Sequence, residues 1–207
     1  STGYEMDRIQ LDLETALSQL KVSTPFVLIG HSFGGAVVTE YALKHPDHIE
    51  KLIIIATAGE FRLSPLFRTG LALPSSVLRL IGPLTRKWLH APPHALREFY
   101  HSNMSKWRGW DKFSQLTVPT LVIRGHRDIV FDRPLFEKVA GSIPAAEDVD
   151  IGVSGHMVML ERREAVDRAI TNFLKGESKK TWRDKSFVIP KTQRDYLKRD
   201  RNWLNHY

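Results

Sequence analysis

A six-residue turn, Gly30–Gly35 with the sequence GHSFGG, lies between the apolar run Phe26–Ile29 and a second apolar segment. This order predicts a strand, a tight turn that carries Ser32, and the start of a helix. Such a turn strains the serine backbone and lifts its hydroxyl clear of the sheet. We expect a Cβ at Gly30 or Gly34 to meet the neighbouring strand or helix, which explains the glycines.

Further apolar runs along the chain predict more buried strands, with helical spacing between them. The expected strands are 26–29, 51–56, 120–124 and 148–153, and the expected helices are 4–20, about 34–44, 137–143 and 161–174. Strands that alternate with helices favour an α/β fold with a parallel sheet flanked by helices. The chain contains no cysteine, which excludes disulfides and thiolate chemistry and is compatible with a cytoplasmic location.

A helical cap is predicted over residues 61–113, between the second and third strands. Prolines interrupt this segment at Pro65, Pro74, Pro83, Pro92 and Pro93. It is too long for a plain loop and too broken for one helix, so we expect several short helices. The cap divides the predicted core into residues 1–60 and 114–175, and a basic linker and tail follow over 176–207.

Three side chains with complementary chemistry each follow a predicted strand. Ser32 follows the first, Asp128 lies in GHRDIV after the third, and His156 lies in GHMVMLE after the fourth. Because the carboxyl ends of parallel strands meet at one edge, these residues are expected to converge. A serine needs a base such as His156 to remove its proton, and Asp128 would orient the imidazole.

The three motifs, in this order, resemble the α/β-hydrolase fold family over about residues 4–174. The resemblance implies a partial α/β-hydrolase fold with a helical cap insertion and a catalytic triad of Ser32, Asp128 and His156. It also implies that the backbone N–H of Phe33 contributes to the oxyanion hole. The remaining residues of the nucleophile elbow would be Gly30, His31, Gly34 and Gly35.

Each of these residues also has a structural interpretation. Ser32 alone is a suitable helix N-cap, and Asp128 is a suitable turn residue, with Asp132 and Glu60 as alternative acids. The other histidines are expected at the surface or behind the site: His31, His45, His48, His126 and His206. A metal site at His90, His94 and His101 is disfavoured because prolines break the helical spacing between the ligands, so no metal and no cofactor is expected.

Compared with the family pattern, the chain lacks the strands and helix that precede the nucleophile elbow. The loop that supplies the second oxyanion-hole N–H is missing with them. The strand 26–29 would then form an open apolar sheet edge, which favours aggregation. We therefore expect this chain to be a fragment of a longer hydrolase, inactive or slow when isolated.

The net charge of +7 is concentrated toward the end of the chain. Residues 175–207 contain ten Lys/Arg and four Asp/Glu, whereas the remainder contains twenty and nineteen. A solvated tail explains this better than a nucleic-acid site, and contact with a membrane surface has no separate support. The last residues, 201–207, resemble the opening of long-chain acyl-CoA synthetases, which implies a fusion to such a domain beyond Tyr207.

The sequence thus predicts a serine hydrolase for carboxylic esters, of the esterase or lipase type. The apolar cap and the synthetase resemblance favour medium- or long-chain acyl groups. Two alternatives stay open: carbon–carbon bond hydrolysis or acyl transfer on the same triad, and a non-catalytic ligand-binding protein with this fold.

Overall fold

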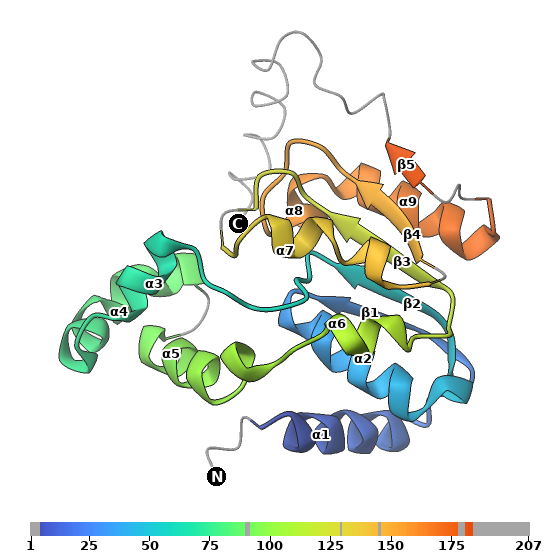
Figure 1. Cartoon of the computed structure of the whole chain (residues 1–207). Coiled ribbons are helices and arrows are strands. Elements are labelled where there is room, and N and C mark those ends of the chain that lie inside the picture. Colours follow the sequence, from blue (N-terminus) through green and yellow to red (C-terminus); the bar gives the residue numbers. More distant parts are fainter. Residues whose placement is uncertain (1–4, 90–91, 129, 145, 178–180, 184–207) are drawn as a thin grey trace, which may run out of the picture.

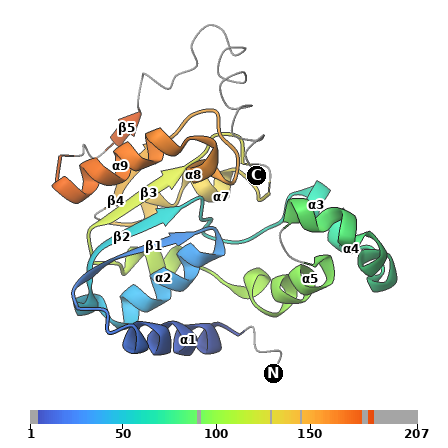
Figure 2. The ribbon, with the colours of Figure 1, turned by 180° about the vertical axis from the view of Figure 1, so that it is seen from behind.

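The computed structural model describes residues 5–89, 92–128, 130–144, 146–177 and 181–183. A parallel sheet of five strands has helices on both faces (Figures 1 and 2). In order across the sheet, the strands are β1 (Phe26–His31), β2 (Ile49–Ile55), β3 (Thr120–Arg124), β4 (Ala146–Asp150) and β5 (Thr181–Arg183). This arrangement confirms the predicted parallel α/β fold.

Helices connect successive strands and cover the sheet. They are α1 (Met6–Gln19), α2 (Phe33–Lys44), α3 (Pro65–Leu71), α4 (Ser75–Leu89), α5 (Pro93–Ser102), α6 (Trp110–Ser114), α7 (Pro134–Glu137), α8 (Val158–Glu161) and α9 (Arg163–Lys175). Short 3₁₀ helices are η1 (Pro46–His48), η2 (Met104–Lys106) and η3 (Ala140–Ser142). Figure 1 shows α2, α6 and α7 on one face of the sheet, and Figure 2 shows α9 on the other.

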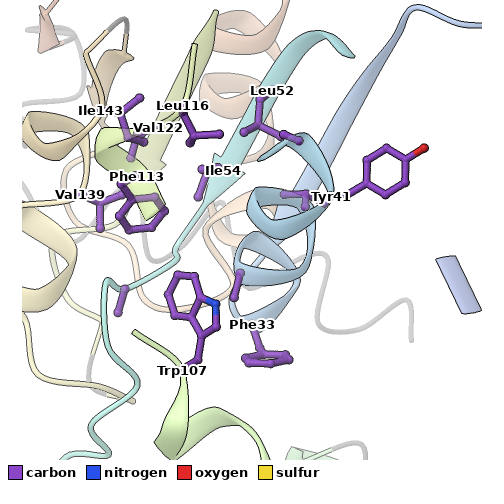
Figure 3. Packing of buried hydrophobic residues seen from close by; sticks show 14 of the residues in the cluster. Phe33, Tyr41, Leu52, Ile54, Trp107, Phe113, Leu116, Val122, Val139 and Ile143 are labelled. Atoms are coloured by element: carbon purple, nitrogen blue, oxygen red, sulfur yellow. The ribbon is translucent and has the colours of Figure 1, made fainter. Parts of the chain in front are cut away.

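Alternate residues of the central strands supply two separate cores. Leu52 and Ile54 of β2 face the cluster that includes Phe33 of α2 and Phe113 of α6 (Figure 3). Ile53 of β2 belongs instead to the cluster that packs against α9. This period of two buries both faces of the strand, as expected for a parallel sheet. Each fully buried Ile or Leu side chain contributes about 1.5–3 kcal/mol relative to an exposed one.

The segment between β2 and β3 forms several short helices, as expected from the prolines that interrupt it. Helices α3, α4 and α5 lie beside the carboxyl ends of the strands, away from the sheet (Figures 1 and 2). The last part of the predicted cap packs differently, because Trp107 and Phe113 belong to the core cluster on the α2 face. Of the described residues, therefore, α3–α5 form a separate helical insertion, and α6 completes the core.

The structure differs from the sequence-based expectations in several boundaries. Instead of a helix over 137–143, α7 ends at Glu137 and η3 follows. The expected helix over 161–174 is divided at Arg162, which has an extended φ of −137°. Strand β4 ends at Asp150 rather than at residue 153, because Gly152 takes a left-handed φ of 72°. Within the predicted tail, β5 pairs with β4.

Candidate active site

Ser32 occupies the junction between β1 and α2. Its backbone angles, a φ of 55° and a ψ of −126°, lie in a region that residues other than glycine rarely adopt. Two hydrogen bonds hold this conformation, one to the last residue of β2 and one from the loop that follows it. The Ser32 N–H donates to the Ile55 carbonyl at 2.8 Å, and the Thr57 hydroxyl donates to the Ser32 carbonyl at 2.8 Å. The strained turn predicted from the sequence is present.

Two of the turn glycines are required by close packing. A Cβ on Gly30 would collide with the backbone carbonyl of Gly34, where β1 passes closest to α2. A Cβ on Gly35 would collide with the side chain of Thr57. In contrast, a Cβ on Gly34 would meet nothing within 4 Å, so the steric reason expected for that glycine is wrong.

A continuous chain of hydrogen bonds joins Ser32, His156 and Asp128. The His156 Nε2 lies 2.8 Å from the Ser32 Oγ, and its Nδ1 lies 2.5 Å from an Asp128 carboxylate oxygen. A carboxylate only accepts hydrogen bonds, so Nδ1 carries the proton and Nε2 is left to accept from the serine hydroxyl. The structure therefore brings together the three residues that the sequence singled out.

The loops that carry Asp128 and His156 are bound to each other by backbone hydrogen bonds. The N–H of His126 donates to the Gly152 carbonyl and that of Arg127 donates to the Ser154 carbonyl, both at 2.8 Å. Asp128 is itself 7% exposed, and its second oxygen accepts the N–H of Val130 at 2.9 Å. Because each carboxylate oxygen accepts a hydrogen bond, one from His156 and one from Val130, the orientation of Asp128 toward the imidazole is fixed.

Phe33 places a backbone donor beside the serine. It is the first residue of α2, where no preceding helical carbonyl is available to accept its N–H. No described residue accepts a hydrogen bond from that group. The helix N-terminus also favours negative charge at this point. The position thus suits an oxyanion, as expected from the sequence.

Comparison with known proteins agrees with the fold. A family model for the alpha/beta hydrolase fold matches residues 1–81. The structure of the putative non-heme bromoperoxidase BpoC from Mycobacterium tuberculosis H37Rv superposes with a TM-score of 0.65 at 21% identity, covering 86% of this chain and 77% of that chain. The chain has the α/β-hydrolase fold.

Similar proteins include a further solved structure and two proteins matched by sequence. An esterase from Exiguobacterium antarcticum superposes with a TM-score of 0.67 at 22% identity, covering 84% of this chain and 75% of that chain. Human protein ABHD8 is 30% identical over 173 residues, which is 73% of this chain and 39% of ABHD8. A 1-acylglycerol-3-phosphate O-acyltransferase from Arabidopsis thaliana is 59% identical over 34 residues, which is 16% of this chain and 8% of that enzyme. The chain thus spans less than two-fifths of these two relatives.

The alternative acids of this α/β-hydrolase chain are engaged or exposed elsewhere. Glu60 accepts the indole N–H of Trp110 at 2.9 Å, and this hydrogen bond is the main reason that its pKa is lowered. Arg62 and Arg108 add ion pairs to the same carboxylate. Asp132 is exposed. Among the described residues, Asp128 is the carboxylate that hydrogen-bonds His156, and neither alternative acid does so.

His31 lies behind the site, one of the two positions expected for it, but the sequence does not predict its contact with the His156 loop. Its Nε2 lies 2.9 Å from the backbone carbonyl of His156, and the two imidazole rings are 5.0 Å apart. Burial is the largest cause that lowers the pKa of His31, so the ring favours its neutral form. The only sequence signal for this contact is that His31 directly precedes the nucleophile position.

The remaining candidate features lie away from the serine or outside the described residues. His45 stacks on His48 and contacts Glu14, and His126 contacts Arg133. Among the described residues, no group of three potential ligands is arranged for a metal ion, and His90 and the segment 201–207 lie outside that part of the chain. No described helix combines the length and the apolar character that a bilayer crossing needs.

Proposed function

We propose that this chain carries the nucleophile, base and acid of a serine hydrolase that cleaves carboxylic esters. The observation that carries the proposal is the hydrogen-bond chain from Asp128 through His156 to Ser32, with distances of 2.5 and 2.8 Å. The strained position of Ser32 and the donor at Phe33 support it further. The match to the family model supports hydrolase chemistry in general.

In the proposed acylation step, the Ser32 Oγ attacks the ester carbonyl carbon while His156 Nε2 takes the hydroxyl proton. The carbonyl oxygen becomes an oxyanion, which the Phe33 N–H stabilises. Collapse of this intermediate breaks the bond to the alcohol oxygen, and Nε2 returns the proton to that leaving group. Asp128 stays ionised throughout and stabilises the imidazolium.

The second half of the reaction releases the acid. His156 Nε2 removes a proton from water, whose oxygen attacks the acyl carbon bound to Ser32. The second tetrahedral intermediate collapses with breakage of the bond to Oγ, and the proton passes from Nε2 to the serine. The carboxylic acid leaves and the resting tautomer is restored.

Aromatic side chains near Ser32 support an acyl group of medium or long length as the substrate. The ring of Phe33, directly after the nucleophile, lies 5.3 Å from Phe61 and 5.1 Å from Phe99 of α5, measured between centroids. Helix α5 of the insertion therefore contacts the residue directly after the nucleophile, and apolar side chains usually line a site for apolar ligands. This environment supports fatty acyl esters over charged substrates.

Labelling by a fluorophosphonate probe tests whether the nucleophile is armed. We expect Ser32 to be labelled in the unmodified chain, and labelling to disappear in Ser32→Ala and His156→Ala. Hydrolysis of p-nitrophenyl esters of increasing acyl length then measures the chain-length preference. If the folded chain is not labelled, the proposal is rejected and a ligand-binding role replaces it.

Acyl transfer is the second candidate, because the short match to an acyltransferase for 1-acylglycerol-3-phosphate is 59% identical. The same acyl-enzyme would then be attacked by an alcohol hydroxyl instead of water. Adding a lysophospholipid acceptor to the ester assay separates the two reactions. Transfer predicts an acylated lipid product at the expense of free acid, whereas hydrolysis predicts free acid alone.

With Phe33 as the single identified oxyanion donor, we expect slow turnover from this chain when isolated. Loss of one such donor costs about 10²–10³ in rate in well-studied serine hydrolases. Fluorophosphonate labelling should nevertheless remain specific for Ser32. Full enzymatic rates from a monomeric preparation would contradict the expectation that further residues complete the site.

A further inference from the structure

The helical insertion carries a charge opposite to that of the core. Residues 61–113 contain nine Lys/Arg and two Asp/Glu, whereas residues 1–60 and 114–174 together contain eleven and seventeen. The net charge of residues 1–174 is close to zero because the positive charge of the insertion offsets the negative charge of the core. Such a separation creates a field that orients the molecule toward anionic surfaces.

Aliphatic side chains are exposed on the same insertion. Leu80 of α4 is 78% exposed, and Val77, one turn before it, and Leu73, just before the helix, are 37% and 39% exposed. The exposed arginines Arg68 and Arg79 lie on the same stretch. Helices α3 and α4 are also furthest from the sheet in both views (Figures 1 and 2). The apolar and basic groups are thus presented together at one end of the molecule.

We propose that α3 and α4 dock on an anionic phospholipid bilayer. Aliphatic side chains beside arginines are the combination by which interfacial helices insert below the headgroups and pair with their phosphates. A nucleic acid would use the arginines but would gain little from Leu80 or Val77. Docking would place the end of the sheet that carries Ser32 near the membrane, independently of what that serine does.

Vesicle flotation with the full chain tests this docking. Vesicles of phosphatidylcholine with phosphatidylserine should bind the chain, and pure phosphatidylcholine should bind it weakly. Leu80→Asp should reduce binding about tenfold and Arg79→Glu about fivefold or more. The matched control for Leu80→Asp is Leu20→Asp, at a residue 74% exposed at the end of α1. The matched control for Arg79→Glu is Arg163→Glu, at a side chain 84% exposed on α9.

Equal binding by the α4 variants and their controls would overturn the proposal, as would no binding to either vesicle. The basic tail is present in every variant, so its own attraction to the vesicles cancels in the comparison. Binding to RNA that depends on Arg79 but not on Leu80, without vesicle binding, would replace the lipid with a nucleic acid. Unchanged turnover of a water-soluble ester shows that each variant is folded.

A second inference concerns His31 and rests on the proposed function. Its Nε2 lies 2.9 Å from the His156 carbonyl, which only accepts, so Nε2 carries the proton of the neutral ring. His31 is covalently joined to Ser32, and the acceptor belongs to the base itself. One side chain therefore connects the strand that presents the nucleophile with the loop that presents the base.

We infer that His31 is a positioning residue that holds the His156 loop in register with Ser32. Other contacts of this loop reach the start of the C-terminal helices, where the Gly155 N–H donates to Glu161 at 2.6 Å and the Val153 carbonyl accepts from Arg162. The loop that carries Asp128 adds the hydrogen bond from the Arg127 N–H to the Ser154 carbonyl. The His31 contact adds a second link between the loop and the nucleophile turn, beside the hydrogen bond between His156 Nε2 and the Ser32 Oγ. Loss of the His31 contact should misplace the base without removing any reacting group.

His31→Leu removes the donor at similar size, and His31→Gln keeps an amide N–H near the position of Nε2. We expect the Leu variant to lose about 10–100-fold in kcat and labelling rate, with KM nearly unchanged, and the Gln variant to recover most of this. His45→Gln is the matched control, because His45 contacts Glu14 away from the site. Recovery by Gln separates a hydrogen-bonding role from simple packing.

Hydrogen exchange of the segment 152–160 gives a readout that does not depend on activity. Exchange should accelerate in His31→Leu and stay at the unmodified rate in His31→Gln and His45→Gln. Equal exchange and equal labelling in all variants would overturn the positioning role while the proposed hydrolase function stands. Absence of labelling in the unmodified chain would reject the proposed function instead.

Discussion

Asp128 is distinguished from the other candidate acids by what its two carboxylate oxygens contact. One oxygen accepts from His156 Nδ1 and the other from the Val130 N–H, and the residue is 7% exposed. Asp132, four residues later, is exposed. Sequence alone left both open because both lie in the loop after β3. Burial and hydrogen bonding, which depend on the folded structure, separate them.

Replacing Asp128 with Asn should therefore disable the nucleophile. The amide NH₂ would donate toward Nδ1 and favour the tautomer that is protonated at Nε2, which does not accept the Ser32 proton. We expect fluorophosphonate labelling to slow on the order of 10³–10⁴-fold. Asp132→Asn, with the same loss of charge, should leave the labelling rate unchanged. Equal effects of the two substitutions on that rate would show that Asp128 has no special role.

The junction of β1 and α2 shows how an element depends on contacts that its own sequence does not reveal. Gly30 and Gly34 flank Ser32 symmetrically in the sequence, yet only Gly30 meets backbone from a neighbouring element. Gly30→Ala should cost about 1–3 kcal/mol of unfolding free energy, because β1 and α2 would have to separate. Gly34→Ala should instead be neutral or gain up to about 1 kcal/mol, since alanine favours a helix. Urea unfolding of both variants measures the two signs, and a loss in both would contradict this account.

Local patterns predicted the elements well, and long-range contacts account for what they missed. The strands and the serine turn follow from apolar runs beside glycines, and the convergence of Ser32, Asp128 and His156 follows from the parallel sheet. By contrast, Thr57 explains Gly35, and it lies on a loop that no spacing rule connects to the turn. The contact between His31 and the His156 carbonyl likewise depends on two distant segments. Such pairings require the fold.

Among the described strands, β1 forms one edge of the sheet. In the described part of the chain it pairs with β2 alone, and its Ile29 side chain is 48% exposed. An edge strand with free backbone groups and an apolar side chain is a template for pairing with another chain. We therefore expect this chain to self-associate through β1 when it is studied on its own.

Ile29→Lys should reduce this self-association, because a charge on an edge strand opposes strand addition. Light scattering and size-exclusion chromatography over a range of protein concentrations would measure the change in mass. Leu20→Lys adds the same charge at a residue 74% exposed at the end of α1, outside β1. If both lysines lower the mass equally, net charge rather than the β1 edge controls association. If only Ile29→Lys lowers the mass, the β1 edge is the site of contact. A segment that pairs with β1 should then also reduce self-association.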